Sequence, residues 1–476
     1  MDYITYEAYG AVGDGVANDM PAIIAAHKAA NDTGRPVKAR KGAHYFIANK
    51  AASAVIHTDT DWTGARFTID DRDLDNVRVP IFSVSEDESE PMNLALESLV
   101  HGQTQIDNPT GRELYVAVFN DDHLDYIRKG ANENKGTARR DCFIVRPDGS
   151  LTSPVSFDFE KITRVFAKPV AEKPLVLRGG EFTTIANCCE SRYNYHSRNI
   201  SITRSRVEVD GLKHYITGEL DHGAPYSGFL SISDCAYTDV HDCLFTGHKI
   251  YDTIGAAGVR VSMGSYDISI GSAISAAFRR CSQTTDILDR GYWGLIGSNF
   301  CRDLLFEDCV FSRFDAHMGV TNCTLRRCKL GWQCLNAIGF GEFLIEETEA
   351  LGHSFVNLRG DYGCTWCGSF TIRNSIWRPM GDSRYIFRAY NDGSHDFGYD
   401  CYLPQNIVID GLRVESDKPQ SQAYVFNDFV GKAGIEGEYA MKRPISVSAR
   451  GITGIGGLKL CENDKLMSET KFTYTD

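Results

Sequence analysis

Acidic side chains recur after short apolar segments in the second half of this sequence. They are Glu219, Asp221, Asp252, Asp289, Asp315 and Asp361. Two carboxyl groups can together break a C–O bond, because one protonates the leaving oxygen while the other acts as base or nucleophile. A histidine two residues after Asp315 could exchange protons with it. We therefore predict acid–base chemistry here, and the catalytic candidates are Asp315, His317, Glu219, Asp221, Asp252 and Asp289.

Aromatic and basic residues accompany these acids. His214, Tyr251 and Trp293 each lie four residues before a glycine, as Asp315 does. Exposed aromatic rings suit the apolar faces of sugars, whereas rings packed beneath loops would serve only the fold, and the sequence leaves both interpretations open. The predicted substrate-binding residues are His214, Tyr251, Trp293, Arg260, Arg313, Arg359 and Asp361. No compact acidic cluster typical of calcium is present, so we predict no metal and no cofactor.

A repeat of apolar anchors positions these residues. The anchors are Ile202, Val240, Phe278, Phe306, Leu325, Ile345, Ile372 and Ile409. With the exception of Gln283, apolar or small residues also stand two before, three after and five after each anchor. A polar or glycine pair lies between the anchor and the third residue after it. Strand side chains alternate with period two, so this phase change predicts a bend between two strands that face one interior.

Three further patterns extend the repeat. A third strand per turn is predicted to end at a glycine column, which consists of Gly218, Gly255, Gly297, Gly319, Gly339 and Gly360. The loops 219–228, 256–267 and 361–368 follow this column, and binding residues collect on such loops. Cysteines recur three residues after an anchor, at the start of the strand that follows the bend: Cys243, Cys281, Cys309 and Cys328. We expect their side chains to point inward and pack in the core rather than to bind a metal.

The opening stretch YGAVGDGVANDMPAIIAAHKAA, residues 9–30, places a glycine-rich turn before a small helix. It lacks the spacing of a phosphate loop or a calcium loop. It is similar to the opening of the pectate-lyase-like (pectin lyase-like) superfamily, in which an aromatic-Gly-Ala-x-Gly-Asp-Gly segment precedes a helix. The resemblance covers about residues 1–70 and 175–415. It implies an all-β fold, a right-handed parallel β-helix with three strands per rung and an N-terminal α-helical cap.

The overall composition excludes several classes of protein. A net charge of −13 opposes nucleic-acid binding, and no apolar run is long enough to span a membrane. The first residues lack the features of a signal peptide, and the odd number of cysteines, 15, favours free thiols in a reducing compartment. We expect a cytoplasmic protein, or a secreted one if a leader has been trimmed. A homo-oligomer is left open.

From these patterns we expect a carbohydrate-active enzyme, a glycoside hydrolase or transglycosylase whose substrate is an oligo- or polysaccharide. One alternative is a polysaccharide lyase that acts by β-elimination on a uronate polymer. The candidates for its base and for the cation that neutralises the uronate are Lys249, Arg260, Arg313, His317 and Arg359. Another is a non-catalytic, tailspike-like glycan-binding protein. The expected divisions are residues 1–85 (cap and first rungs), 86–173 (insertion or irregular rungs), 174–416 (regular rungs with the site) and 417–476 (closing segment).

Overall fold

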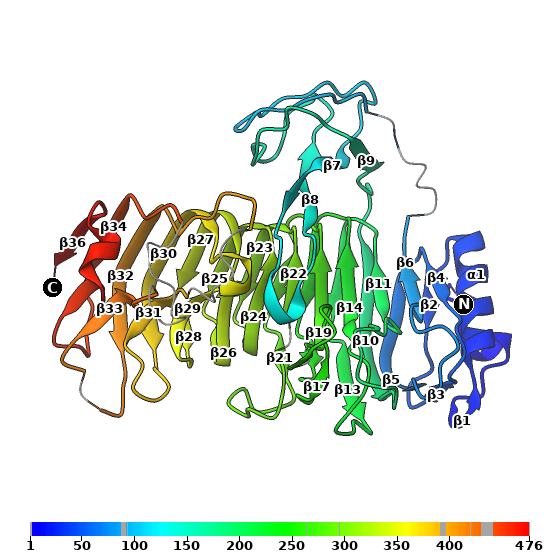
Figure 1. Ribbon diagram of the computed structural model, residues 1–476. Coiled ribbons are helices and arrows are strands. Elements are labelled where there is room, and N and C mark those ends of the chain that lie inside the picture. The colour runs from blue at the N-terminus through cyan, green and yellow to red at the C-terminus, as the bar shows by residue number, and fades with distance from the viewer. Residues whose placement is uncertain are drawn as a thin grey trace.

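The structure is a computed structural model that describes residues 2–86, 92, 94–262, 264–294, 296–390, 397–418, 420–429 and 441–475. It is an all-β protein, with 49% strand and 6% helix. Figure 1 shows one long coil of parallel strands that runs from the N-terminal helix to the C-terminus, with a smaller body standing on its middle. No helix among the described residues combines the length and apolar character that a membrane crossing requires.

The strands of the coil pair in parallel in three series. The first series consists of β2 (Val37–Lys38), β5 (Thr60–Asp70), β10 (Leu175–Ile185), β12 (Val207–Asp210), β15 (Thr238–His241), β20 (Ala277–Arg279), β23 (Arg302–Glu307), β25 (Val320–Arg326), β27 (Gly339–Glu346), β30 (Trp366–Trp377), β32 (Asn406–Val414), β34 (Ser446–Arg450) and β36 (Lys471–Thr475). The second consists of β1 (Asp14–Asn18), β3 (His44–Ile47), β5, β10, β13 (Lys213–Thr217), β16 (Leu244–Phe245), β21 (Ser282–Gln283), β24 (Val310–Met318), β26 (Lys329–Ala337), β28 (Glu349–Ala350), β30 and β32.

The third series carries the functional residues described below. It consists of β4 (Ala54–Ile56), β6 (Phe82–Val84), β11 (Ile200–Ile202), β14 (Ser227–Ser233), β19 (Tyr266–Gly271), β22 (Ile296–Asn299), β24, β26, β29 (Ser354–Leu358), β31 (Tyr385–Arg388), β33 (Ala423–Phe426) and β35 (Leu458–Cys461). Some strands belong to two series because they run across a corner of the coil. Strands β33 to β36 extend the coil through the predicted closing segment.

Seven of the eight predicted anchors are in register. The backbone pairs each residue with the next in the order Val240, Phe278, Phe306, Leu325, Ile345, Ile372 and Ile409. The first anchor, Ile202, was wrong, because it lies in β11 of the third series and Val209 is the residue that pairs with Val240. The segments 200–202 and 207–209 both alternate apolar and polar residues, so the pattern alone could not separate them.

The predicted bend is visible in the backbone. Its second residue adopts the left-handed conformation with positive φ at Asp242, Arg280, Asp308, Arg327, Glu347 and Asn374. The charges alternate between rungs as expected, because Arg280 pairs with Asp242 at 2.7 Å and Arg327 with Asp308 at 2.8 Å. These pairs are exposed and each stabilises the fold by at most about 1 kcal/mol.

The glycine column was wrong in its first three members. Gly297 lies inside β22 and pairs with Asp315 rather than with Gly319. Gly218 follows β13, which belongs to the second series, and Gly255 follows β17 (Asp252–Ile254), which pairs with β18 (Arg260–Ser262) in a hairpin outside the three series. The third series is instead continued by β14 and β19. Strands β13 and β17 each end just before a glycine, whereas β14 of the third series ends at Ser233, so a terminal glycine does not identify the series.

The cysteine column points inward as predicted. Cys243, Cys281, Cys309 and Cys328 are buried, and each thiol lies within 3.7 Å of a carbonyl oxygen of the preceding rung. We expect these four thiols to react slowly with a thiol reagent in the native protein, since labelling requires local opening. Mass spectrometry of labelled peptides over time tests this, with the exposed Cys188 as the fast-reacting control. Native labelling of the column at the rate of Cys188 would contradict the packing.

The N-terminal stretch folds as a turn and one helix. Helix α1 (Met20–Thr33) has Pro21 in its first turn and contacts β4 at the N-terminal end of the coil (Figure 1). Asp19 precedes the helix, but its carboxylate accepts hydrogen bonds from the amides of Val12 and Phe46 at 2.6 and 3.3 Å and does not cap α1. The Asp and Gly residues of the opening motif therefore fix the turn against the first strands.

The segment between β6 and β10 forms the smaller body in Figure 1. It contains an antiparallel sheet of β7 (Leu114–Asp125), β8 (Thr137–Val145) and β9 (Arg164–Pro169), with an apolar cluster of its own. The connection from β7 to β8 descends in front of the coil and ends in a short 3-10 helix, Gly130–Asn132, that contacts β18. We call this connection, residues 126–136, the hairpin tip. The other 3-10 helices are Glu7–Tyr9, Gly360–Tyr362 and Asp464–Met467.

Candidate functional site

The site is built around Asp315 in β24. Phe314 and Ala316 on either side of it belong to the apolar core, so the Asp315 side chain projects from the outer face of the third series. It pairs with Gly297 of the preceding rung and Asn336 of the following one. The absence of a side chain at Gly297 leaves room for the ring of Tyr266, which a Cβ there would meet at 3.2 Å.

Asp315 is completely buried under polar groups that bind its carboxylate. Its Oδ2 accepts hydrogen bonds from the Tyr266 hydroxyl at 2.6 Å and from Arg313 Nη2 at 2.7 Å, and Arg359 Nη1 lies 3.1 Å from both oxygens. Burial alone would raise the pKa of this carboxyl, but the two guanidinium groups hold it well below its usual range. Asp315 is therefore ionised near neutral pH, which argues against proton donation from it in the resting site.

Arg359 joins Asp315 to a second carboxylate. Its Nε and Nη2 donate to the two oxygens of Asp361 at 3.1 and 2.7 Å, while its Nη1 binds Asp315. Arg128 of the hairpin tip reaches the same Asp361 at 3.0 Å. The Asp361 side chain is 29% exposed, whereas that of Asp315 is inaccessible. Of the two carboxylates, Asp361 is therefore the one that a ligand can approach.

His317 lies beside this network as a neutral imidazole. Burial, together with the charge of Arg359, lowers its pKa to about 3. Its Nδ1 lies 2.9 Å from the side-chain oxygen of Asn299, so Nδ1 carries the proton, and its Nε2 lies 3.3 Å from Arg128. The predicted neighbour Asp315 is not its hydrogen-bond partner. A neutral histidine can accept a proton, but here its free nitrogen faces a guanidinium group.

Aromatic rings line the arginines. Arg313 stacks on Trp293 at 4.7 Å, and Arg128 and Arg359 stack on Tyr362 at 4.5 and 5.3 Å. Trp293 thus supports Arg313 in this structure. Part of the Trp293 ring therefore serves packing rather than being open to a sugar. The network of Arg128, Arg313, Arg359, Asp315 and Asp361, which we call the arginine–aspartate network, carries one net positive charge in an acidic protein. It therefore suits a ligand with negative charge or with many hydroxyl oxygens.

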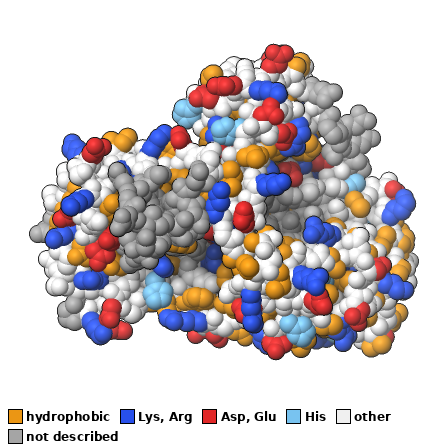
Figure 2. Space-filling view, viewed as in Figure 1, with side chains coloured by type: hydrophobic (Ala, Val, Ile, Leu, Met, Phe, Trp, Pro, Cys, Tyr) orange, Lys and Arg blue, Asp and Glu red, His pale blue; other side chains and the backbone are white. Residues whose placement is uncertain are grey.

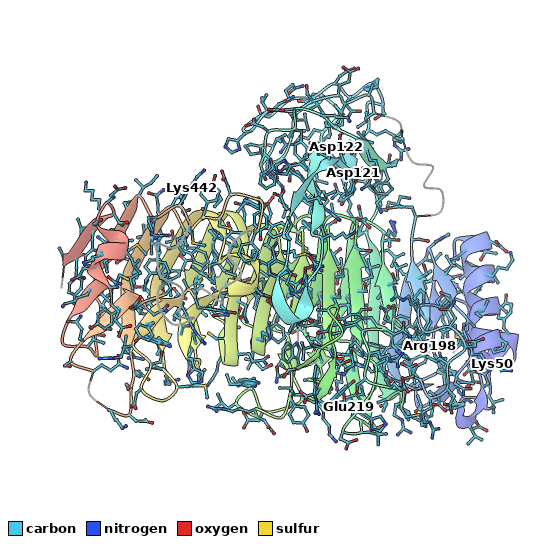
Figure 3. All side chains as sticks on the ribbon, in the orientation of Figure 1. Lys50, Asp121, Asp122, Arg198, Glu219 and Lys442 are labelled. Atoms are coloured by element: carbon cyan, nitrogen blue, oxygen red, sulfur yellow. The ribbon has the colours of Figure 1, made fainter. Side chains whose placement is uncertain are left out.

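His214 and Glu219 belong to a second, separate cluster. Asp267 of β19 is buried between His214 Nδ1 at 2.7 Å and His248 Nε2 at 3.4 Å, and His248 Nδ1 lies 3.2 Å from Glu219. Glu219 lies on the lower edge of the coil, on the side away from the smaller body (Figure 3). The backbone of Trp293 links the two clusters, because its amide donates to the carbonyl of His248 at 2.7 Å.

The charge state of His248 makes a prediction about stability. Burial lowers its pKa, but hydrogen bonds to Asp267 and Glu219 outweigh burial and raise the pKa to about 9. The charged His248 therefore stabilises the folded protein fully below about pH 6.5, the pKa of a histidine in the unfolded chain. This stabilisation is lost as the pH rises through 9. We expect the wild type to have a higher free energy of unfolding than His248→Gln at pH 6.5. This difference should fall by up to about 3 kcal/mol between pH 6.5 and 9.5. Urea unfolding at several pH values measures this, and a pH-independent difference would contradict a charged His248.

The remaining predicted residues lie apart from both clusters. The Asp221 side chain is 97% exposed and pairs only with its neighbour His222 at 2.8 Å. Asp252 and Arg260 pair with each other at 2.7 Å across the β17–β18 hairpin, and Asp289 accepts from the amide of Gly291 at 2.8 Å. Tyr251 donates to the carbonyl of Ala224 at 3.4 Å beneath a loop. Each of these partners is local, so the structure brings none of them to Asp315.

Sequence reasoning missed four residues of these clusters. They are Arg128, Tyr266, His248 and Asp267. Tyr266 and Asp267 are adjacent in β19, the third-series strand that the glycine column failed to identify. Arg128 belongs to the insertion, for which the repeat offered no register.

On the face shown in Figure 2 acidic and basic side chains are interspersed, without a large field of one sign. The overall surface therefore does not indicate a strongly charged polymer as partner. Any preference of the protein for a charged ligand must come from the local arginine–aspartate network.

Comparisons with known proteins show the fold. No protein-family profile and no curated protein matches the sequence. The chain is similar in structure to the tailspike gp61 of Pseudomonas phage phi297 (TM-score 0.59, 12% identity, 99% of this chain and 84% of that one) and to the tailspike gp49 of Pseudomonas phage LKA1 (0.59, 14%, 98% and 84%). It is also similar to the Gp54 tailspike of Acinetobacter baumannii bacteriophage AP22, solved in complex with A. baumannii capsular saccharide (0.55, 10%, 99% and 79%). The predicted parallel β-helix is confirmed.

Proposed function

We propose that this protein binds an oligo- or polysaccharide on the outer face of the third series and cleaves it at the arginine–aspartate network. The observation that carries the proposal is the network itself, in which two carboxylates share Arg359 while only Asp361 is accessible. Such fixed charges in a largely water-excluded site are typical of catalytic centres. The fold shared with a tailspike that was solved with a capsular saccharide supports the class of ligand.

The first reaction class is glycoside hydrolysis or transglycosylation. In this mechanism Asp361 acts as base or nucleophile, because it is ionised and accessible. Asp315 does not react but holds Arg313 and Arg359 in place. This class also needs a proton donor beside the network. None of the four predicted acids supplies it in this structure, because Glu219 lies in a separate cluster and Asp221, Asp252 and Asp289 have local partners.

The second reaction class is β-elimination on a uronate polymer. The guanidinium groups of the network favour it, because an arginine can neutralise the uronate carboxylate. The neutral His317 could accept the proton only after Arg128 moves away from its Nε2, which lies 3.3 Å from Arg128 Nη2. A protein that only binds a glycan, as a third possibility, would use the same residues without turnover.

Product analysis on a glycan panel distinguishes these possibilities. The full chain is incubated with neutral and uronate-containing polysaccharides, and products are followed by mass and by the ultraviolet absorbance of unsaturated uronates. Products that have gained one water per cleavage support hydrolysis, and unsaturated products support elimination. Binding without any product over long incubation would leave a glycan-binding protein and overturn the enzymatic proposal.

A further inference from the structure

A large cavity lies between the smaller body and the coil, next to the arginine–aspartate network. Its volume is about 1170 Å³. Its walls come from the β7–β8 sheet and the segment 154–158 on one side, from the start of the first-series strands on the other, and from the segment 397–405. Ligand pockets usually enclose about 300–1,000 Å³, so the cavity has room for a ligand of several rings.

A wall of tyrosines separates this cavity from the proposed catalytic site. Tyr126 and Tyr399 line the cavity, and both pack against Tyr362, with ring centres of Tyr126 and Tyr362 6.2 Å apart and a 2.9 Å hydrogen bond from the Tyr399 hydroxyl to the Tyr362 carbonyl. The ring of Tyr362 supports Arg128 and Arg359. The cavity and the network are therefore neighbours that share a wall but no lining residue.

All but one of the carboxylates and guanidinium groups that line the cavity have a fixed partner of opposite charge. The exception is Asp158, whose Oδ1 accepts a hydrogen bond from the amide of His101 at 2.8 Å. Asp125 binds Arg139 through two hydrogen bonds of 2.9 and 3.2 Å, and Asp400 binds Lys442 at 2.7 Å. Figure 3 places Lys442 on the same edge of the coil as the smaller body. Arg302 pairs with Asp141 at 2.5 Å. A ligand here meets paired carboxylates and guanidinium groups, which offer hydrogen bonds to hydroxyl groups without requiring a charge in return.

Two buried polar groups in the lining lack a partner. The Tyr126 hydroxyl and Arg302 Nε make no hydrogen bond to the described residues, although these residues are only 3% and 2% exposed. Leaving such a group unsatisfied costs about 1–3 kcal/mol. Both atoms are shielded from solvent, so a hydroxyl group of a ligand reaches them only when the lining side chains shift. Aromatic rings of Phe157 and Phe340, packed edge to face at 4.3 Å, provide apolar surface in the same lining.

We propose that this cavity is a second carbohydrate site, which binds an uncharged part of a glycan independently of the arginine–aspartate network. Paired polar groups beside aromatic rings match a neutral sugar, which presents hydroxyl groups at its edge and C–H groups on its faces. The identity of the ligand as a sugar rests on the proposed function, whereas the location of the site rests on the cavity alone. Binding in two places would hold a long chain across the shared tyrosine wall.

The experiment measures binding of neutral hexa-saccharides of glucose, galactose and mannose by calorimetry and by saturation-transfer NMR, with a galacturonate hexamer as the charged comparison. Cys367→Phe places a ring in the cavity, and Cys367→Ser is its matched control, since Cys367 lines the cavity and is partly exposed. We expect Cys367→Phe to weaken binding of a neutral oligosaccharide at least tenfold and Cys367→Ser to leave it unchanged. Tyr126→Phe, which removes the unpartnered hydroxyl, should weaken it about five- to tenfold.

The outcomes separate this inference from the catalytic proposal. Neutral-sugar binding that survives Asp361→Asn and is lost in Cys367→Phe supports a second site, even if no cleavage product is ever found. Binding that is indifferent to both Cys367→Phe and Tyr126→Phe places the sugar elsewhere and overturns the inference. The absence of binding by every neutral oligosaccharide, or binding of the galacturonate hexamer alone, overturns it as well, and then the unpartnered groups are served by water only.

Discussion

Asp361→Asn is expected to lower kcat on the true substrate by at least about 100-fold, the scale of losing a general base or nucleophile. Asp361 is the accessible carboxylate of the network, and Arg359 and Arg128 fix both of its oxygens. Asparagine keeps the shape and one hydrogen-bond acceptor, so the fold should survive while the negative charge is lost. Steady-state kinetics on the substrate identified by the glycan panel measure the effect.

Asp221→Asn is the matched control for this prediction. It makes the same chemical change on a loop where the side chain is 97% exposed, and we expect activity within about twofold of wild type. Near-full activity of a folded Asp361→Asn protein would remove Asp361 from the chemistry. A large loss in His317→Gln together with near-full activity of Asp361→Asn would favour elimination over hydrolysis.

The periodic part of the fold could be predicted from the sequence, because each rung repeats the same contacts. The register from Val240 to Ile409 follows from the apolar alternation and the polar bend. The left-handed backbone at the bend explains why Asp, Asn or Gly stands at several of its second positions. The prediction failed at Ile202, where two alternating segments lie within ten residues of one another. Alternation shows that a segment is a strand, but not to which side of the coil it belongs.

The candidate site could be predicted only in part, for a related reason. Arg313, Asp315 and His317 lie on one strand, and Arg359 and Asp361 follow the third-series strand two rungs on, so the repeat itself brings them together. Arg128 reaches His317 across 189 residues of sequence through an insertion that has no repeat. Its docking depends on side-chain contacts of the hairpin tip, and no periodicity encodes these.

The charge states of the site residues could not be predicted from the sequence either. The sequence shows only the neighbours of Asp315 along the chain, and these suggest a candidate acid. It does not show that Asp315 is buried against two arginines and Tyr266. The same holds for His317, whose neutrality depends on burial beside Arg359. In both cases the three-dimensional neighbours, rather than the residue type, decide which proton transfers are available.

Asp315→Asn is expected to destabilise the protein by about 3–5 kcal/mol, in addition to reducing activity, because it leaves a buried guanidinium group without its counter-charge. Arg359 keeps Asp361 as a partner in this variant. Arg313 is therefore the residue that loses its counter-charge, because its partner at 2.7 Å is Asp315. This differs from the expectation for an exposed catalytic carboxylate, where asparagine is well tolerated. Urea unfolding of the wild type and the variant measures the change.

A double-mutant cycle identifies the origin of this effect. Adding Arg313→Gln to Asp315→Asn removes the stranded charge, and we expect the double variant to recover at least about 1 kcal/mol relative to Asp315→Asn. Asp242→Asn is the exposed comparison, because Asp242 accepts two hydrogen bonds from Arg280 at 2.8 and 2.7 Å on the surface, and it should cost less than about 1 kcal/mol. If Asp315→Asn unfolds at the wild-type urea concentration, Asp315 is not the buried, ionised centre of the network, and the role of Arg359 as a fixed bridge between two carboxylates fails with it.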